Sequence, residues 1–310
     1  MLPIPGYVWA TPGRHVGADS TALASAGGAV VRADAARGLA DLLRGQGDSL
    51  YGLSGKLRVR LLAGNTGTFA RPVMERLFGD SAAQRPGIYA VVDSALAQPL
   101  SFITLRPFAA KQAGRVGLYR VGFWPAERGR RSPGAYANPD GFIEVTPANQ
   151  DTYVSEHFRL RDFLTKDQQD VWPKYLVLRE ELVDKLELVI EELGHDGVRV
   201  DHMVVMSGFR TPQYNARGVG RGGRAGDSRH QYGDAADVFV DNNRDGRMDD
   251  LNGDRRVDTR DATVILRAVE RVESRFPQLV GGAGLYRATR AHGPFAHVDV
   301  RGTRARWGRA

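Results

Sequence analysis

Three residues in the second half of the chain have the types and the spacing of metal ligands. His230 and Asp237 lie seven residues apart in SRHQYGDAADVFVD, at the entrance to an apolar stretch, and His297 lies in FAHVDVR. Two imidazole nitrogens and one carboxylate oxygen suit a tetrahedral Zn²⁺ ion and leave its fourth position to water. An open site of this kind lowers the pKa of the bound water to about 7, which is the chemistry of a metal-dependent hydrolase.

Two short strands must bring these side chains together. FAHVDVR alternates strictly between apolar and polar residues, which predicts a half-buried strand. Side chains two apart share one face of a strand, so His297 and Asp299 are expected to point away from the core while Val298 and Val300 pack on it. ADVFV reads as a short buried strand, and Gly233 permits a tight turn of the backbone before it.

Two amphipathic helices are expected beside these strands. YLVLREELVDKLELVIEELG is apolar on one helical face over residues 178–193, and Gly194 is expected to end the helix. DATVILRAVERVESRF has the same spacing over residues 264–276, and VRVDHMVVMSGFR predicts a strand and a turn. Residues 146–310 are therefore predicted to form an α+β domain, with a small antiparallel sheet flanked by helices and an insert at 241–261.

The first half of the chain has a different texture. Over residues 51–145, the runs KLRVRLLAG, GIYAVVD, PLSFITLRPF and GRVGLYRVGFW are short and rich in β-formers. Gly, Pro and Asn separate them, as in a small sandwich or barrel. We expect a β-rich domain here, preceded by a partly irregular segment over residues 1–50. Nothing in these residues indicates the role of this domain.

Composition excludes several classes of protein. With 310 residues, 42% hydrophobic and 25% charged, the chain can form two globular domains. The absence of cysteine excludes disulfides, thiolate zinc sites and a cysteine nucleophile. No apolar run is long enough to span a membrane. The formal net charge of +7 suits an anionic partner, but the charge is scattered and no nucleic-acid motif accompanies it, so we expect no nucleic-acid partner.

Three ordered motifs resemble a known family. SRHQYGDAAD fits the pattern S-x-H-x-x-G-x-A-x-D, SGFRTPQYN lies upstream of it, and FAHVDV lies downstream. VSEHFRLRDFL resembles the segment that opens such domains. The second half of the chain thus resembles the zinc D-Ala-D-Ala carboxypeptidase and murein endopeptidase family, whose fold is shared by the hedgehog signalling domain. The resemblance covers residues 150–310 and does not extend to the first half.

The resemblance implies a role for each matching residue. Zn²⁺ would be bound by His230, Asp237 and His297. Arg210, in SGFRT, would hold the oxyanion that develops on the scissile carbonyl, which needs a fixed positive charge. Ser228 would hydrogen-bond near the ligands or the substrate, although a plain turn residue is an almost equally good interpretation.

The chain departs from the family at the general base. Many relatives carry a glutamate three residues before the last zinc histidine, and here that position is Pro294. Others carry a histidine two residues before it, and here that position is Phe295. Asp299 is the favoured acceptor of the water's proton, although it could instead orient His297. His292 is the alternative, either stabilising the transition state or simply lying in the loop.

The insert has the oxygen spacing of a calcium-binding loop. Counting from Asp250, oxygen ligands fall at positions 1, 3, 5, 7, 9 and 12, with a backbone carbonyl at position 7: Asp250, Asn252, Asp254, Arg256, Asp258 and Asp261. The loop resembles those of dockerins and EF-hands, except that Arg255 replaces the glycine of position 6 and position 12 is an aspartate instead of a glutamate.

A second calcium frame overlaps the first. It consists of Asp241, Asn243, Asp245, Gly246 and Asp249, and it runs into residues 250–252 of the other frame. We therefore expect one Ca²⁺ ion, or two ions that share ligands, with a structural role. Such loops work best where calcium is millimolar, which favours the cell exterior.

Together these features predict a zinc-dependent peptidoglycan peptidase, either a carboxypeptidase or an endopeptidase. Its partners would be peptidoglycan peptides and anionic wall polymers, and its cofactors Zn²⁺ and Ca²⁺. The expected location is extracytoplasmic, although MLPIPGYVWATPGRH lacks the basic-then-apolar order of an export signal. The alternative, which the absent glutamate keeps open, is a catalytically inactive module that zinc and calcium stabilise and that binds the cell wall or another protein.

Overall fold

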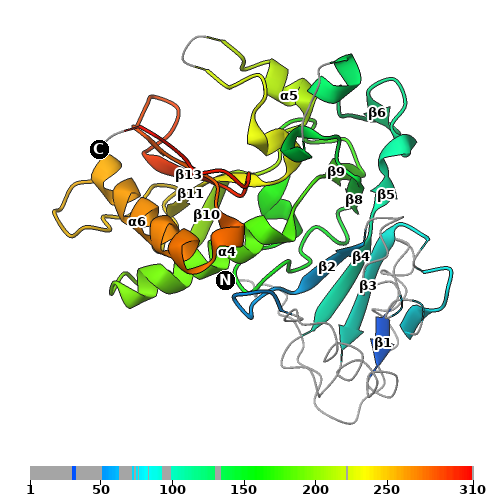
Figure 1. Cartoon of the computed structure of the whole chain (residues 1–310), viewed down its shortest axis with the longest axis horizontal. Coiled ribbons are helices and arrows are strands. Elements are labelled where there is room, and N and C mark those ends of the chain that lie inside the picture. The colour runs from blue at the N-terminus through cyan, green and yellow to red at the C-terminus, as the bar shows by residue number, and fades with distance from the viewer. Residues whose placement is uncertain are drawn as a thin grey trace, which may run out of the picture.

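The structure, a computed structural model, describes residues 30–32, 51–62, 72, 75, 77–82, 84–92, 99–129, 134–220 and 223–308. The segment predicted over residues 1–50 thus lies outside the described residues, except for strand β1 (Val30–Arg32). Helices and several small sheets make the described part a mixed α+β structure, which confirms the predicted fold class (Figure 1).

A five-stranded sheet forms the centre of the second half, in the order β10-β11-β13-β12-β14. Its neighbours pair antiparallel, except for the parallel pair β12–β14. The strands are β10 (Met203–Ser207), β11 (Ala235–Val240), β12 (Gly282–Tyr286), β13 (Phe295–Asp299) and β14 (Ala305–Trp307). β10, β11 and β13 lie where the sequence predicts strands.

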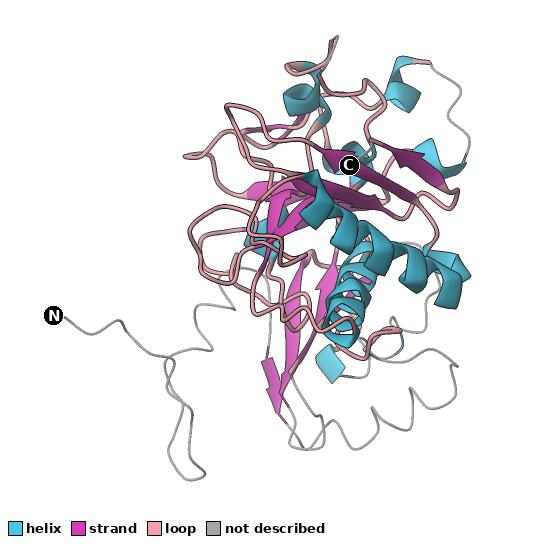
Figure 2. Cartoon of the chain, turned by 90° about the vertical axis from the view of Figure 1, so that its left-hand side faces the viewer, coloured by secondary structure: helices cyan, strands magenta, loops and turns pink. Residues whose placement is uncertain are grey.

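Two long helices, α4 (Glu180–His195) and α6 (Thr259–Arg275), pack against each other, and α6 also contacts β12 and β13 (Figures 1 and 2). Both lie where apolar periodicity predicts them. The end of α4 differs from the prediction. The helix continues through Gly194 to His195, and the chain turns at Gly197, where φ is +78°. Asp258 caps α6 by accepting a hydrogen bond from the backbone N–H of Arg260.

The first half contains a four-stranded sheet in the order β1-β3-β4-β2. β2 (Val59–Leu62) lies parallel to β4 (Leu100–Thr104), β4 lies antiparallel to β3 (Gly87–Val92), and β3 lies parallel to β1. The described residues form an open mixed sheet and show neither the sandwich nor the barrel that the sequence suggests. Alternating short runs predict strands but do not determine how the strands pair.

Smaller sheets join the two halves. β8 (Gly141–Val145) pairs with β5 (Arg106–Pro107) on one side and with β9 (Lys174–Leu176) on the other. The pair β8–β9 crosses the domain boundary predicted at residues 145–146, and one apolar cluster extends from Leu57 to Val300. A hairpin consists of β6 (Arg115–Val116) and β7 (Tyr119–Arg120).

Short helices connect these elements. The chain forms α5 (Pro212–Ala216), with Thr211 as its N-cap. The 3₁₀ turns are η2 (Phe108–Ala110), η3 (Pro125–Arg128), η4 (Gly134–Tyr136), η5 (Leu160–Phe163), η6 (Arg229–Tyr232) and η7 (Pro277–Leu279). Across the described part of the chain, none of the helices has both the length and the apolar character that crossing a bilayer requires.

Candidate metal centre

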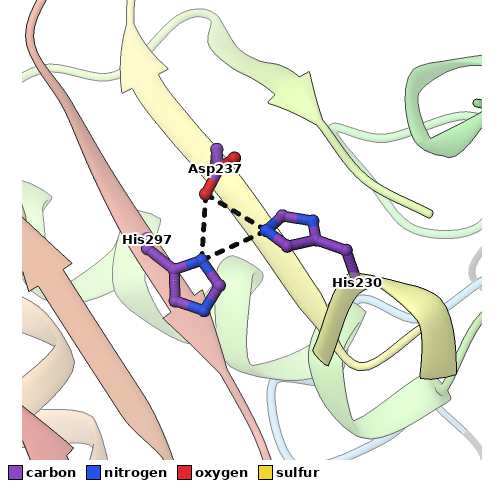
Figure 3. A group of neighbouring side chains, drawn as sticks. All are labelled: His230, Asp237 and His297. Atoms are coloured by element: carbon purple, nitrogen blue, oxygen red, sulfur yellow. Dashed lines mark hydrogen bonds and ion pairs between the residues drawn. The ribbon is translucent and has the colours of Figure 1, made fainter. Parts of the chain in front are cut away.

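His230, Asp237 and His297 converge on one point (Figure 3). Nε2 of His230 lies 3.2 Å from Nδ1 of His297. Oδ1 of Asp237 lies 2.9 Å from the same Nδ1 and 3.2 Å from Nε2 of His230. A tetrahedral zinc ion with ligand atoms at about 2.0–2.1 Å holds those atoms about 3.3 Å apart. The three separations therefore suit a tetrahedral ion.

Strand register and one glycine position these ligands. Asp237 on β11 lies directly opposite His297 on β13, so both side chains point to the same face of the sheet. His230 comes from η6, after which Gly233 turns the chain into β11 with φ of +69°. A Cβ on Gly233 would lie 2.3 Å from the carbonyl oxygen of Val177, so only glycine fits this turn.

Each imidazole is held by its second nitrogen. Nδ1 of His230 lies 2.7 Å from the carbonyl oxygen of Gly208, and Nε2 of His297 lies 3.1 Å from Oδ2 of Asp299. Both partners are acceptors, so in the neutral imidazoles these nitrogens carry the protons. Nε2 of His230 and Nδ1 of His297 then each carry a lone electron pair that faces the Asp237 carboxylate. Three buried electron pairs turned toward one another form a site suited to a cation.

The pKa values of the three side chains also indicate that positive charge is favoured at this site. Burial disfavours the charged imidazole of His230 and lowers its pKa. Burial acts likewise on His297, but hydrogen bonds to Asp237 and Asp299 outweigh it and raise its pKa. Burial alone would raise the pKa of Asp237, yet the charges and hydrogen bonds of the two histidines hold it well below its usual range. The site therefore attracts positive charge, which a proton or a bound metal ion would supply.

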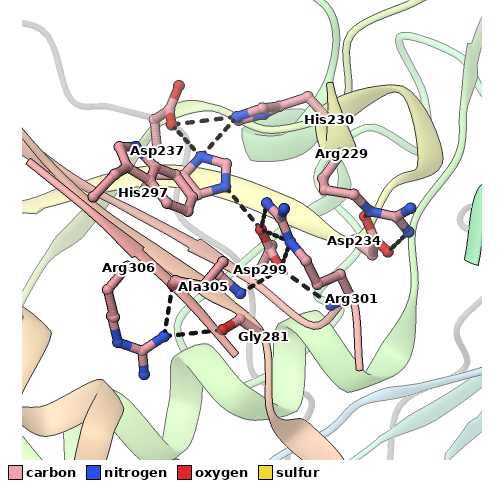
Figure 4. Close-up of polar contacts among 12 residues, drawn as sticks. Arg229, His230, Asp234, Asp237, Gly281, His297, Asp299, Arg301, Ala305 and Arg306 are labelled. Atoms are coloured by element: carbon pink, nitrogen blue, oxygen red, sulfur yellow. Dashed lines mark hydrogen bonds and ion pairs between the residues drawn. The ribbon is translucent and has the colours of Figure 1, made fainter. Parts of the chain in front are cut away.

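Asp299 lies behind His297, on the ring edge opposite the ligand nitrogen (Figure 4). Its side chain is fully buried and accepts hydrogen bonds from the backbone N–H of Gly282 at 2.7 Å and from Nε of Arg301 at 2.9 Å. Burial would raise the pKa of Asp299, but hydrogen bonds from His297 and Arg301 hold it far below its usual range. Of the two roles that the sequence leaves open for Asp299, this geometry favours orientation of His297.

Arg210 lies beside the ligands. Its guanidinium donates from Nη2 to Oδ2 of Asp237 and from Nε to Oγ of Ser207, at 2.8 Å for the second bond. Its backbone N–H donates to the carbonyl oxygen of His230, at 3.0 Å. Arg210 thus places a positive charge beside His230, Asp237 and His297. Ser228 precedes η6 and lines the same cleft.

A cleft of about 730 Å³ opens over the triad, and His292 lines it too. Aromatic rings cover much of its wall. The rings of Tyr286 and Phe295 stack with centroids 4.6 Å apart, and the Trp307 ring lies 5.1 Å from that of His297. His292 packs its ring against Phe295, and its Nδ1 lies 2.8 Å from the carbonyl oxygen of Gly293.

Sequence reasoning missed the contribution of the C-terminal residues. No strand is predicted in RGTRARWGRA, but Ala305–Trp307 forms β14 beside β12. Arg306 pairs with Glu273 of α6, and Trp307 donates from Nε1 to the hydroxyl of Tyr286 at 3.0 Å. The apolar Trp307 between arginine-rich flanks is the feature of the sequence that could have predicted this packing.

The acidic insert forms two consecutive turns of the same kind. The Asp241 carboxylate accepts from the N–H groups of Asp245 and Gly246, and the Asp250 carboxylate accepts from those of Gly253 and Arg255. The other predicted oxygen side chains also accept backbone N–H groups: Asn243, Asp245, Asp249, Asn252, Asp254, Asp258 and Asp261. Among the described residues, only His230, Asp237 and His297 gather as a group of three side chains that could hold a metal ion, so calcium binding, including the role of the Arg256 carbonyl, stays a prediction.

Comparisons of the chain with protein-family models, with curated proteins and with solved structures found no match.

Proposed function

We propose that this protein is a zinc-dependent peptidase that acts outside the cytoplasm on peptidoglycan peptides, at a bond next to a D-amino acid. The observation that carries the proposal is the buried set of three ligand atoms, 2.9–3.2 Å apart, at a cleft. The reaction and substrate class come from the resemblance of SRHQYGDAAD, SGFRTPQYN and FAHVDV to the zinc carboxypeptidase and murein endopeptidase family. Calcium in the insert would be structural.

The residues of this chain divide the work around the metal. A bound zinc ion would supply a water with a pKa near 7 and a Lewis acid for the carbonyl. Arg210, held by Asp237 and Ser207, stabilises the negative charge that develops on the carbonyl oxygen. Asp299 fixes the orientation of His297.

His292 takes the proton in this proposal. It lines the cleft and is partly exposed. Its Nδ1 donates to the carbonyl of Gly293, which leaves Nε2 as the unprotonated nitrogen that can accept a proton and return it to the leaving amine. Asp299 is poorly placed for this step because its carboxylate is buried behind the ring of His297.

One observation favours a second candidate, a zinc-holding module that binds wall polymers or another protein without turnover. Among the described residues that line the cleft, the carboxylates are those of Asp227 and Asp237, and Asp237 is a ligand. The glutamate that serves as general base in many relatives is therefore not replaced by another glutamate in the cleft.

The test combines metal analysis with a cleavage assay on muropeptides. We expect one zinc ion per chain at the triad, cleavage that a chelator abolishes and zinc restores, and loss of both zinc and cleavage in His230→Ala. His195→Ala is the matched control, because the His195 side chain is 61% exposed on α4 and should be dispensable. Zinc binding without cleavage would favour the binding module, and a chain that binds no divalent metal would exclude both candidates.

A further inference from the structure

Arg224 differs from the other arginines that line the cleft, because no acidic residue of the described chain pairs with it. Arg210 pairs with Asp237, Arg301 with Asp299, and Arg217 with Asp167. The side-chain contacts of Arg224 are instead with Tyr214, from Nη1 to its carbonyl oxygen at 2.7 Å and over its ring at 4.2 Å. Among the described residues, the cleft therefore contains a guanidinium without a counter-ion.

The structure holds this guanidinium in place. Tyr214 supports one face of it, and the backbone N–H of Arg224 donates to the carbonyl of Gly218 at 2.7 Å. A Cβ on Gly218 would lie 2.7 Å from Cδ of Arg224, so the side chain lies directly against the glycine backbone. An arginine fixed in this way loses little conformational freedom on binding and keeps most of its five N–H donors for a ligand.

A second guanidinium lies nearby in the same cleft. Arg210 lines the cleft together with Arg224, and the two positive charges lie close enough to interact. Two like charges that line one partly buried cleft repel each other, and an anion bound beside them relieves that repulsion. The arrangement is therefore suited to an anionic group of the substrate.

We propose that Arg224 is a substrate-binding residue that holds a carboxylate close to the scissile bond. A planar carboxylate matches the fork of a guanidinium and accepts two parallel hydrogen bonds from it. The inference rests on the proposed peptidase function for the reaction and adds the substrate class: peptides with a carboxylate next to the cleaved bond. That carboxylate is either the free C-terminus or an acidic side chain.

The experiment compares three peptides of the same stem sequence ending in D-Ala-D-Ala: the free acid, the C-terminal amide, and an amide with a glutamate beside the scissile bond. We expect the wild type to prefer one of the two carboxylate-bearing peptides over the plain amide. The identity of the preferred peptide shows whether Arg224 binds the free C-terminus or an acidic side chain. Arg224→Gln should lower kcat/KM for the preferred peptide about 10- to 100-fold, as expected for charge-assisted hydrogen bonds. The plain amide should be unaffected. Arg224→Lys should keep part of the preference.

Arg217→Gln is the matched control. Arg217 lines the same cleft but is 55% exposed and pairs with Asp167 at 3.6 Å, so its loss should leave the preference unchanged. Zinc content and melting temperature report the integrity of each variant. Equal losses in Arg217→Gln and Arg224→Gln would indicate a general positive field and overturn the proposal, as would a wild type that treats all three peptides alike.

Binding separates this inference from the peptidase proposal. If the wild type cleaves none of the peptides, calorimetry with the same three peptides measures the preference directly. Tighter binding of a carboxylate-bearing peptide that is lost in Arg224→Gln would retain Arg224 as the carboxylate site and reject the peptidase. Equal binding of all three peptides would reject the carboxylate site as well.

Discussion

At the scale of single residues, the division of roles around His297 depends on which edge of its ring each partner touches. Nδ1 faces Asp237, which with His230 would complete the metal site, and Nε2 faces Asp299. A carboxylate bound to the second nitrogen of a ligand histidine fixes its tautomer and raises its basicity. Asp299 should therefore act on metal affinity, and His292, which lines the open cleft, on proton transfer.

This division gives a prediction with two variants. Asp299→Asn should weaken zinc binding about 10- to 100-fold and keep most turnover once zinc is saturating. His292→Gln should leave zinc affinity unchanged and lower kcat about 100-fold or more, since it removes a general base. Competition with a coloured chelator measures the affinity, and peptide hydrolysis at saturating zinc measures kcat. If Asp299→Asn binds zinc with normal affinity but loses turnover, the role of proton acceptor belongs to Asp299 instead of His292.

At the scale of elements, the two turns of the insert differ in how well their residues suit the backbone. Gly246 and Arg255 occupy position 6 of their respective frames, and both have positive φ, +81° and +65°. Glycine adopts this conformation freely, whereas an L-residue with a side chain is strained there. The absence of glycine at position 6, noted from the sequence, thus corresponds to a strained arginine in the structure.

Replacing this arginine tests both the strain and the calcium prediction. Arg255→Gly should raise stability by about 0.5–1 kcal/mol, after allowance for the greater freedom of glycine in the unfolded chain. Arg256→Gly is the control, because Arg256 has an ordinary φ and should only lose stability. Calcium should raise the melting temperature of all three proteins by binding the folded state. A melting temperature that calcium leaves unchanged would contradict the calcium site.

At the scale of the whole molecule, Glu180 connects the N-terminal sheet to the second half of the chain. It lies in the first turn of α4, accepts a hydrogen bond from the backbone N–H of Leu61 on β2, and pairs with Arg60 at 3.2 Å. Its side chain is 19% exposed, and burial, partly offset by Arg60, raises its pKa from 4.5 to about 7. The carboxyl group of Glu180, at the contact between α4 and β2, thus titrates near neutral pH.

The sign of the resulting pH dependence follows from proton binding. Between pH 4.5 and about 7 the folded chain holds a proton on Glu180 that the unfolded chain has released. This contribution is fully present below pH 4.5 and is lost as pH rises through about 7, by at most about 3 kcal/mol. Denaturant unfolding of chelated protein across this range should show a fall that Glu180→Gln removes. Glu181→Gln, at an exposed neighbour, should retain it.

The sequence by itself determined the local features of this protein. Helical periodicity located α4 and α6, alternation located β13, and the spacing of histidine and aspartate identified all three groups that converge in the triad. These signals are local, because a helix or strand repeats its apolar residues within its own length and a ligand motif is a matter of residue type. The α+β class could be predicted for the same reason.

Only the tertiary structure decided how these pieces meet. The register that sets Asp237 opposite His297 and the pairing of the C-terminal residues with β12 both join segments that are separate in the chain. The strand order of the open mixed sheet in the first half likewise depends on pairing between separate segments. Strand pairing and side-chain packing depend on the shape of the whole core, and a local pattern of residues is compatible with several such arrangements.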